Sequence, residues 1–198
     1  IWQLESPDSI FIEEGVVRWA GGRVFTNAVR ISPDMKEFVV PIVCDRPLLT
    51  EILSQFVVTG AEGGGTVSGR IPLLIGKDTI RFEDGFLYSS PGQGGSVKVL
   101  ALDMLSAGIP QNTPQFAQVD FAAEALKNLQ YNWVKLLLNS EGEDLVMQMH
   151  MDGKPLQSLP FVYDSQTGLL QRVDDNTQGI RQPLRLDVNF RIPMNRLL

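Results

Sequence analysis

The chain has 198 residues, 43% of them hydrophobic, and a formal net charge of −6 at pH 7. This composition is sufficient for a substantial core and excludes an intrinsically disordered chain. The acidic balance argues against nucleic acid as a partner and against docking on anionic lipid through a polybasic patch, because both need a basic surface. We expect residues 1–198 to form a single domain.

The N-terminal part of the chain contains four runs that are rich in β-branched and aromatic residues. These runs are Ser9–Glu13, Gly15–Trp19, Arg23–Ile31 and Glu37–Val43, and the turn residues Ala20-Gly21-Gly22 separate the second from the third. Such runs between turn signals predict antiparallel strands.

The hydrophobic period changes at residues 47–56, which begin with a proline. The apolar residues recur there at helical spacing, namely Leu48, Leu49, Ile52, Leu53 and Phe56. We expect a short helix that caps the end of a β core, and the alternative is a helix that plugs a groove or touches a membrane. The glycines of Gly60–Gly65 predict a flexible loop, which lacks the Gly-Lys-Ser/Thr ending of a phosphate-binding loop.

The segment Gly69–Gly92 contains two apolar runs, Arg70–Ile75 and Thr79–Phe82, joined by the turn residues Gly76-Lys77-Asp78. Asp84-Gly85 then predicts a tight turn or a bulge before the strand resumes. The apolar residues of this segment are expected to build one surface, and they are Ile71, Leu73, Ile75, Ile80, Phe82 and Phe86.

A second helix is expected over about residues 114–130. Thr113 and Pro114 are typical of the N-cap and the first helical position. An apolar stripe then continues at helical spacing to about Gln130. We expect this helix to pack on the sheet, and a lipid-facing or lid helix is the alternative.

The clearest alternation of apolar and polar residues follows this helix. Tyr131–Leu138 predicts an apolar strand, Asn139–Glu143 a hairpin loop, Asp152–Pro155 a turn, and Gln166–Gly179 a polar connection. Two further strands alternate strictly and present apolar residues on one face, namely Leu145, Met147, Met149 and Met151, then Leu184, Leu186, Val188, Phe190 and Ile192.

These patterns together predict a mainly β fold, in which a curved, largely antiparallel sheet forms an open groove with two short helices, about 47–56 and 114–130. A closed core is the default for half-buried strands, but a methionine stripe adapts well to varied apolar ligands. The candidate groove residues are Ile71, Leu73, Ile80, Phe82, Trp133, Leu145, Met147, Met149, Met151, Leu184, Leu186, Val188 and Phe190.

The chain offers few residues for catalysis or metal binding. Cys44 and His150 are the only cysteine and histidine, so no zinc site is expected. The carboxylate pairs follow turn residues and are interpreted as solvated charges, and neither a G-x-S-x-G nor a D-x-D-x-D-G motif occurs. We therefore expect no enzyme activity, no catalytic residue, no metal and no cofactor.

Several short motifs follow one another in a specific order. G-x-I-P-L occurs at Gly69–Leu73, D-G-x-L at Asp84–Leu87, and A-L-x-N-L at Ala125–Leu129. This order, from about Arg46 to the C-terminus, resembles the AsmA-like intermembrane phospholipid transport proteins. Within that family it is most similar to the C-terminal region of YdbH-like members, whose domain is also called "dicarboxylate transport". The segment Asp152–Pro155 departs by one residue from the Asn-Pro form found there.

The resemblance implies a β-taco-like groove that carries phospholipid acyl chains between the two membranes of a Gram-negative envelope. It further implies that the chain is the C-terminal fragment of a longer periplasmic protein with an inner-membrane anchor. A small outer-membrane lipoprotein would add a strand at the edge Arg181–Ile192. The alternatives are a structural or assembly domain with a filled core, and a dicarboxylate-binding module in which arginines converge, the candidates being Arg70, Arg81, Arg181 and Arg185.

Overall fold

The computed structural model describes residues 2–6, 9–56, 60–100, 109–110, 113–166, 168–174 and 179–194. In these residues twelve strands form one sheet, and two more form a small separate sheet. Neighbouring strands pair antiparallel, and the large sheet runs from an edge at β1 (Trp2–Ser6) to an edge at β14 (Leu184–Pro193) without closing into a barrel. The expected mainly β fold with a curved, open sheet is confirmed.

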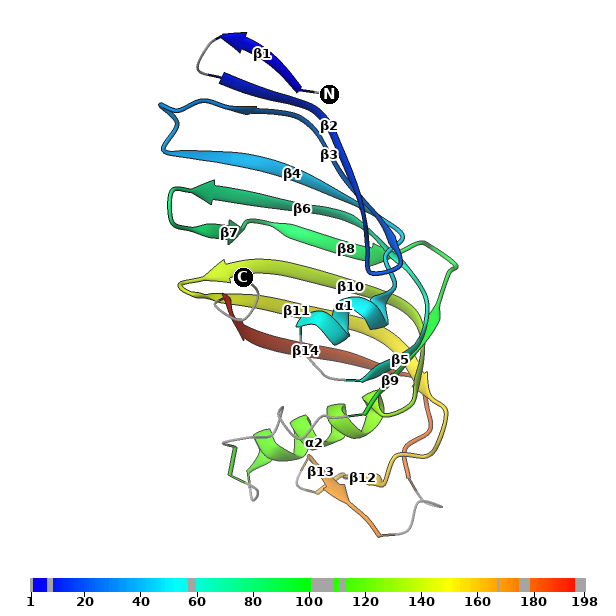
Figure 1. Ribbon diagram of the computed structural model, residues 1–198. Coiled ribbons are helices and arrows are strands. Elements are labelled where there is room, and N and C mark those ends of the chain that lie inside the picture. The colour runs from blue at the N-terminus through cyan, green and yellow to red at the C-terminus, as the bar shows by residue number, and fades with distance from the viewer. Residues whose placement is uncertain are drawn as a thin grey trace.

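The elements follow one another along the chain in an order that Figure 1 traces by colour. The other strands of the large sheet are β2 (Ser9–Trp19), β3 (Gly22–Ile31), β4 (Glu37–Asp45), β5 (Ala61–Gly64), β6 (Val67–Gly76), β7 (Ile80–Phe82), β8 (Gly85–Ser89), β9 (Gly95–Val99), β10 (Leu129–Glu141) and β11 (Asp144–Pro155). The small sheet contains β12 (Phe161–Asp164) and β13 (Leu169–Arg172), and the helices are α1 (Leu49–Phe56) and α2 (Pro114–Leu126). The main path across the large sheet is β1-β2-β3-β4-β6-β8-β10-β11-β14.

The sheet divides along β10, which pairs with β9 over its first residues and with β8 further on. At the division the backbone N–H of Val134 donates to Ser89 Oγ at 3.0 Å, and Ser89 is buried. Val134 lies between the part of β10 that pairs with β9 and the part that pairs with β8, so neither strand pairing supplies an acceptor for its N–H. The bond to Ser89 avoids the free-energy cost of a buried N–H without a partner. The β9–β5 branch is thereby free to turn away from β8 and to meet α1, which contacts β5.

Helix α1 packs on the concave face of the sheet. Leu49, Ile52 and Leu53 are at most 1% exposed and belong to the central hydrophobic cluster. The backbone N–H of Leu49 donates to the Gly65 carbonyl at 3.1 Å, which ties the start of the helix to the β5 branch. Figure 1 shows α1 in front of β10 and β11. The expected helix over 47–56 is therefore present and begins two residues later.

Helix α2 and the β12–β13 hairpin form a smaller unit below β14 in Figure 1. Thr113 caps α2 as expected, because its Oγ1 accepts from the Phe116 N–H at 3.2 Å. The helix ends at Leu126 rather than near residue 130, since β10 already begins at Leu129. Arg172 of the hairpin is 2.9 Å from Asp120 and 2.8 Å from Glu124.

Two expected loops are strands. Ala61–Gly64 pairs with β9, and Gly63 permits this pairing because a Cβ there would lie 2.1 Å from the Ser96 carbonyl oxygen. The expected turn at Asp152–Pro155 lies within β11, whose residues pair with β10 on one side and, as far as Gly153, with β14 on the other. Part of the polar connection Gln166–Gly179 is also ordered as β13. Pairing partners overrode the local turn preference in each case.

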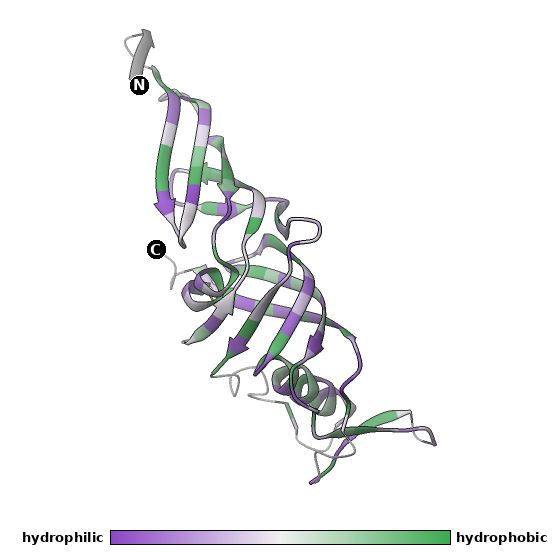
Figure 2. Ribbon diagram, turned by 90° about the vertical axis from the view of Figure 1, so that its right-hand side faces the viewer, coloured by the Kyte–Doolittle hydropathy of each residue, from purple (hydrophilic) through white to green (hydrophobic). Residues whose placement is uncertain are grey.

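One hydrophobic cluster connects the large sheet, both helices and the hairpin. It includes the inward-facing residues of β10, β11 and β14 together with Leu126 and Phe161. Figure 2 shows hydrophobic and hydrophilic residues alternating along the strands, as expected when one face is covered and the other is in water.

A candidate apolar binding trough

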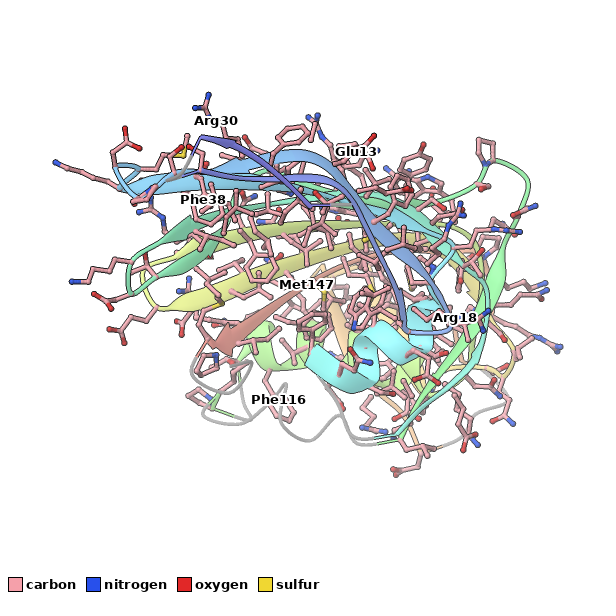
Figure 3. The ribbon with its side chains drawn as sticks, turned by 45° about the horizontal axis from the view of Figure 1, so that its top comes forward. Glu13, Arg18, Arg30, Phe38, Phe116 and Met147 are labelled. Atoms are coloured by element: carbon pink, nitrogen blue, oxygen red, sulfur yellow. The ribbon has the colours of Figure 1, made fainter. Side chains whose placement is uncertain are left out.

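The concave face of the sheet has a covered half and an open half. In the covered half, which comprises β8, β10, β11 and β14, Leu136, Met147 and Met149 are at most 1% exposed. In Figure 3, Met147 lies on the inner side of the curved sheet, close to α1. The methionine stripe is therefore buried in the same hydrophobic cluster as the apolar face of α1, and its side chains are not exposed to a groove in the described structure.

The open half is the concave face of β2, β3, β4, β6 and β7, which we call the open trough. Cross-strand partners place apolar residues opposite one another, for example Leu73 between Val40 on β4 and Phe82 on β7. These three side chains are only half-buried, unlike those over α1. The difference arises because neither helix extends over these strands (Figure 1).

An apolar cavity of about 280 Å³ lies where the open trough meets α1. Its lining comes from the sheet and from the last residue of the helix, and comprises Val17, Arg18, Trp19, Val24, Ile42, Cys44, Phe56, Ile71, Leu73 and Phe82. Its size is near the lower end of the range for small-molecule sites. Val17 is 60% exposed in the absence of a ligand, so an apolar occupant would remove this surface from water.

A contact between the β2–β3 hairpin and α1 bounds this cavity. Trp19 Nε1 donates to Gln55 Oε1 at 2.6 Å, and the Trp19 and Phe56 rings meet edge to face at 6.0 Å. Aromatic pairs of this geometry stabilise by about 0.5–1.5 kcal/mol beyond their burial. The contact holds the β2–β3 hairpin against α1 at the end of the open trough where the cavity lies.

Cys44 and His150, the single cysteine and the single histidine of the sequence, lie on opposite faces of the sheet. Cys44 lines the cavity, but burial raises the pKa of its thiol to about 11, which keeps the thiol protonated near neutral pH. His150 lies on the opposite face of the sheet, where its Nδ1 hydrogen-bonds Asp187 Oδ1 at 2.5 Å. Among the described residues no group of three or more His, Cys, Asp or Glu side chains could hold a metal ion.

The structure distributes the predicted groove residues over three places. The covered half contains Leu145, Met147, Met149, Met151, Leu186, Val188 and Phe190, with Leu184 half-buried at its end. Ile71, Leu73 and Phe82 line the cavity, where Ile71 is buried, and Ile80 pairs with Ile75 beside it.

Trp133 does not face the groove. The register of β10 against β11 shifts between Tyr131 and Trp133, which is a β-bulge. The bulge moves Trp133 to the convex face and leaves Tyr131 and Val134 inside, at 1% and 0% exposure. Uninterrupted alternation would have placed Tyr131 and Trp133 on one face.

Sequence reasoning missed the residues that form the open trough in the N-terminal half. Val17, Trp19, Val24 and Ile42 alternate with outward-facing neighbours, so their pattern alone could have identified a candidate surface. The pattern was present, but it does not show which apolar face stays uncovered.

The arginines that a dicarboxylate site would need do not converge. Arg81 pairs with Glu37 at 3.4 Å, and Arg185 pairs with Asp152 at 2.7 Å on β11. Arg70 lies on the convex face, over the Phe86 ring. Arg181 is exposed in the segment before β14. Arg70, Arg81 and Arg185 therefore do not form a cluster of free cations that faces the trough.

Comparison with protein-family models, curated proteins and solved structures found no match. Neither helix in the described part of the chain is long and apolar enough to cross a membrane.

Proposed function

We propose that this chain is a non-enzymatic segment of a conduit that holds phospholipid acyl chains in its open trough. The observation that carries the proposal is the uncovered concave face of β2, β3, β4, β6 and β7, which leads to an apolar cavity bounded on one side by Phe56 of α1. A closed structural domain would cover this face as α1 covers the other half.

The chemistry of the trough suits an acyl chain better than a polar ligand. Burial of each methylene contributes about 0.8 kcal/mol, so ten methylenes along the trough contribute about 8 kcal/mol before the cost of ordering the chain. The nine-residue strand β4 spans about 30 Å, which gives a long apolar path. No specific hydrogen bond is needed, and the cavity wall offers few polar groups.

The motif order supports a position in a Gram-negative envelope, as part of a YdbH-like member of the AsmA-like family. In this proposal the chain belongs to a longer periplasmic protein that bridges the inner and outer membranes. A small outer-membrane lipoprotein would add a strand at β14, which pairs only with β11 within the described residues. An added strand would extend the sheet without entering the trough.

Val16 and Val17 form a matched pair for the test. Both are exposed valines on β2, at 52% and 60%, but Val17 lines the cavity and Val16 faces the convex side. A photo-crosslinking amino acid placed at each position in the periplasm of a Gram-negative cell should yield a phospholipid adduct at Val17 alone. Mass spectrometry of the purified adduct identifies the lipid.

A second measurement uses the charge variants Val17→Glu and Val16→Glu. Lipid that copurifies with the protein should fall at least about tenfold in the first variant and remain in the second, because only the first places a charge against the acyl chain. Circular dichroism checks that both variants fold. Equal adducts at the two positions, or no copurified lipid in the wild-type chain, would contradict the proposal.

A further inference from the structure

The convex face carries a row of five apolar residues and one arginine that crosses six strands. Register places each residue opposite the next, from β2 through β3, β4, β6 and β8 to β10, and the row comprises Val16, Phe25, Val43, Arg70, Phe86 and Leu137. Five steps between strands give the row a length of roughly 24 Å. We call it the convex row, and it lies on the side of the sheet opposite the trough.

The convex row is uncovered in the described structure. Val16 and Val43 are 52% and 36% exposed, and beside the row Tyr88 and Trp133 are 41% and 37% exposed. Several exposed large apolar and aromatic side chains on one face can mark an interaction surface. Tyrosine, tryptophan and arginine are also the residues that most often dominate binding energy at protein interfaces.

A hollow of about 600 Å³ lies at the β10 end of the row. Phe86 and Tyr88 stack with ring centroids 6.1 Å apart and form one wall with Arg70, while Trp133 and Lys135 belong to the other side. A hollow walled by aromatic rings can receive a large apolar side chain from a partner. Such an anchor in a pocket is a common centre of an interface.

The charges along this end of the row are mainly positive although the whole chain is acidic. Arg70 and Lys135 line the hollow and form no ion pair with any other described residue, whereas Asp84 is the one carboxylate there. The Arg70 guanidinium lies 5.4 Å from the centroid of the Phe86 ring. Stacking restrains the guanidinium and leaves its N–H donors available for a carboxylate.

We infer that the convex row binds a segment of a partner protein that combines an aromatic or aliphatic anchor with a neighbouring Asp or Glu. The anchor fills the hollow at Tyr88 and Trp133, and the carboxylate meets Arg70. The positive charge of the hollow favours an acidic segment over a basic one. This interface is separate from the trough and from the β14 edge, so it does not depend on the proposed lipid function.

In the test, peptides that bind the immobilised chain are selected from a phage-displayed library of random peptides. Enriched peptides should share an aromatic or aliphatic residue within a few positions of an Asp or Glu. Fluorescence anisotropy with a synthetic enriched peptide should show at least tenfold weaker binding to Arg70→Gln and to Trp133→Ser, and weaker binding at higher salt. The trough variant Val17→Glu is the control and should bind as the wild type does.

A double-mutant cycle separates recognition of the carboxylate from loss of fold. Replacing the peptide's acidic residue with its amide should weaken binding to the wild type but not further weaken binding to Arg70→Gln. Circular dichroism and thermal unfolding verify the fold of each variant. The inference is overturned if selection enriches no peptide, or if the peptides bind Arg70→Gln as tightly as the wild type. It is also overturned if the wild type binds a saccharide array or anionic vesicles and Arg70→Gln and Trp133→Ser lose that binding instead.

Discussion

Cys44 illustrates how the sheet controls the chemistry of a single residue. It lies on β4 beside Val24 of β3, on the concave face, and is 2% exposed. Burial disfavours the thiolate and raises the pKa of the thiol to about 11. A cysteine without an adjacent base or cation is an inert part of an apolar wall.

The raised pKa predicts slow modification of Cys44. At pH 8 iodoacetamide should alkylate the native thiol roughly 100-fold more slowly than the thiol of the urea-unfolded chain, because few native molecules carry the thiolate. Mass spectrometry follows both reactions. Native stability should also fall as the pH rises from about 9 to about 11, since the unfolded thiol ionises first. Native and unfolded rates within a few-fold of each other would refute this prediction.

At the scale of elements, α1 decides which part of the concave face is core and which part is trough. Its eight residues are too few to be stable alone in water. The helix is held instead by its buried face, which includes Leu49, Ile52 and Leu53, and by the Trp19–Gln55 hydrogen bond. A longer helix at this place would extend over more of the trough.

Shortening a buried side chain of α1 should destabilise the whole domain. Ile52→Ala removes a fully buried side chain and should lower the free energy of unfolding by about 2–5 kcal/mol. The exposed neighbour Glu51→Ala is the control and should change it by less than about 0.5 kcal/mol. Urea denaturation measures both values, and equal effects of the two substitutions would show that α1 does not pack as described.

For the molecule as a whole, the sheet must remain open without aggregating. Its β14 edge carries charged residues on the convex face, and each pairs back onto β11 or β10. Arg185 pairs with Asp152 at 2.7 Å, and Arg191 pairs with Glu141 at 2.6 Å. Exposed pairs of this kind add little stability, but charged residues on an edge strand oppose pairing with other copies.

Removal of these edge charges should cause self-association. The double variant Arg185→Val and Arg191→Val should form larger species than the wild type does at the same concentration, because it leaves an apolar free edge. Sedimentation velocity measures the proportions of monomer, dimer and larger species. The control is the double variant Arg81→Val and Lys98→Val, which removes two positive charges away from this edge. Equal association of the control would show that the loss of positive charge, and not the exposed edge, causes the effect.

The amino-acid pattern by itself determined the class of fold and the positions of most strands. Strict alternation in Leu145–Met151 and Leu184–Ile192 defined strands with one apolar face, and Thr113-Pro114 defined the start of α2. These signals are local, since side-chain direction depends only on the period of the backbone.

Only the tertiary structure decided which apolar faces are covered. Apolar residues face the concave side both from β11, whose methionine stripe α1 helps to close off, and from β2 and β4, which neither described helix covers. Likewise, the bulge that turns Trp133 outward and the pairing that makes Ala61–Gly64 a strand depend on partners distant in sequence. Alternation specifies which side chains share one face of the sheet, but whether that face leaves water is decided by the elements that pack against it.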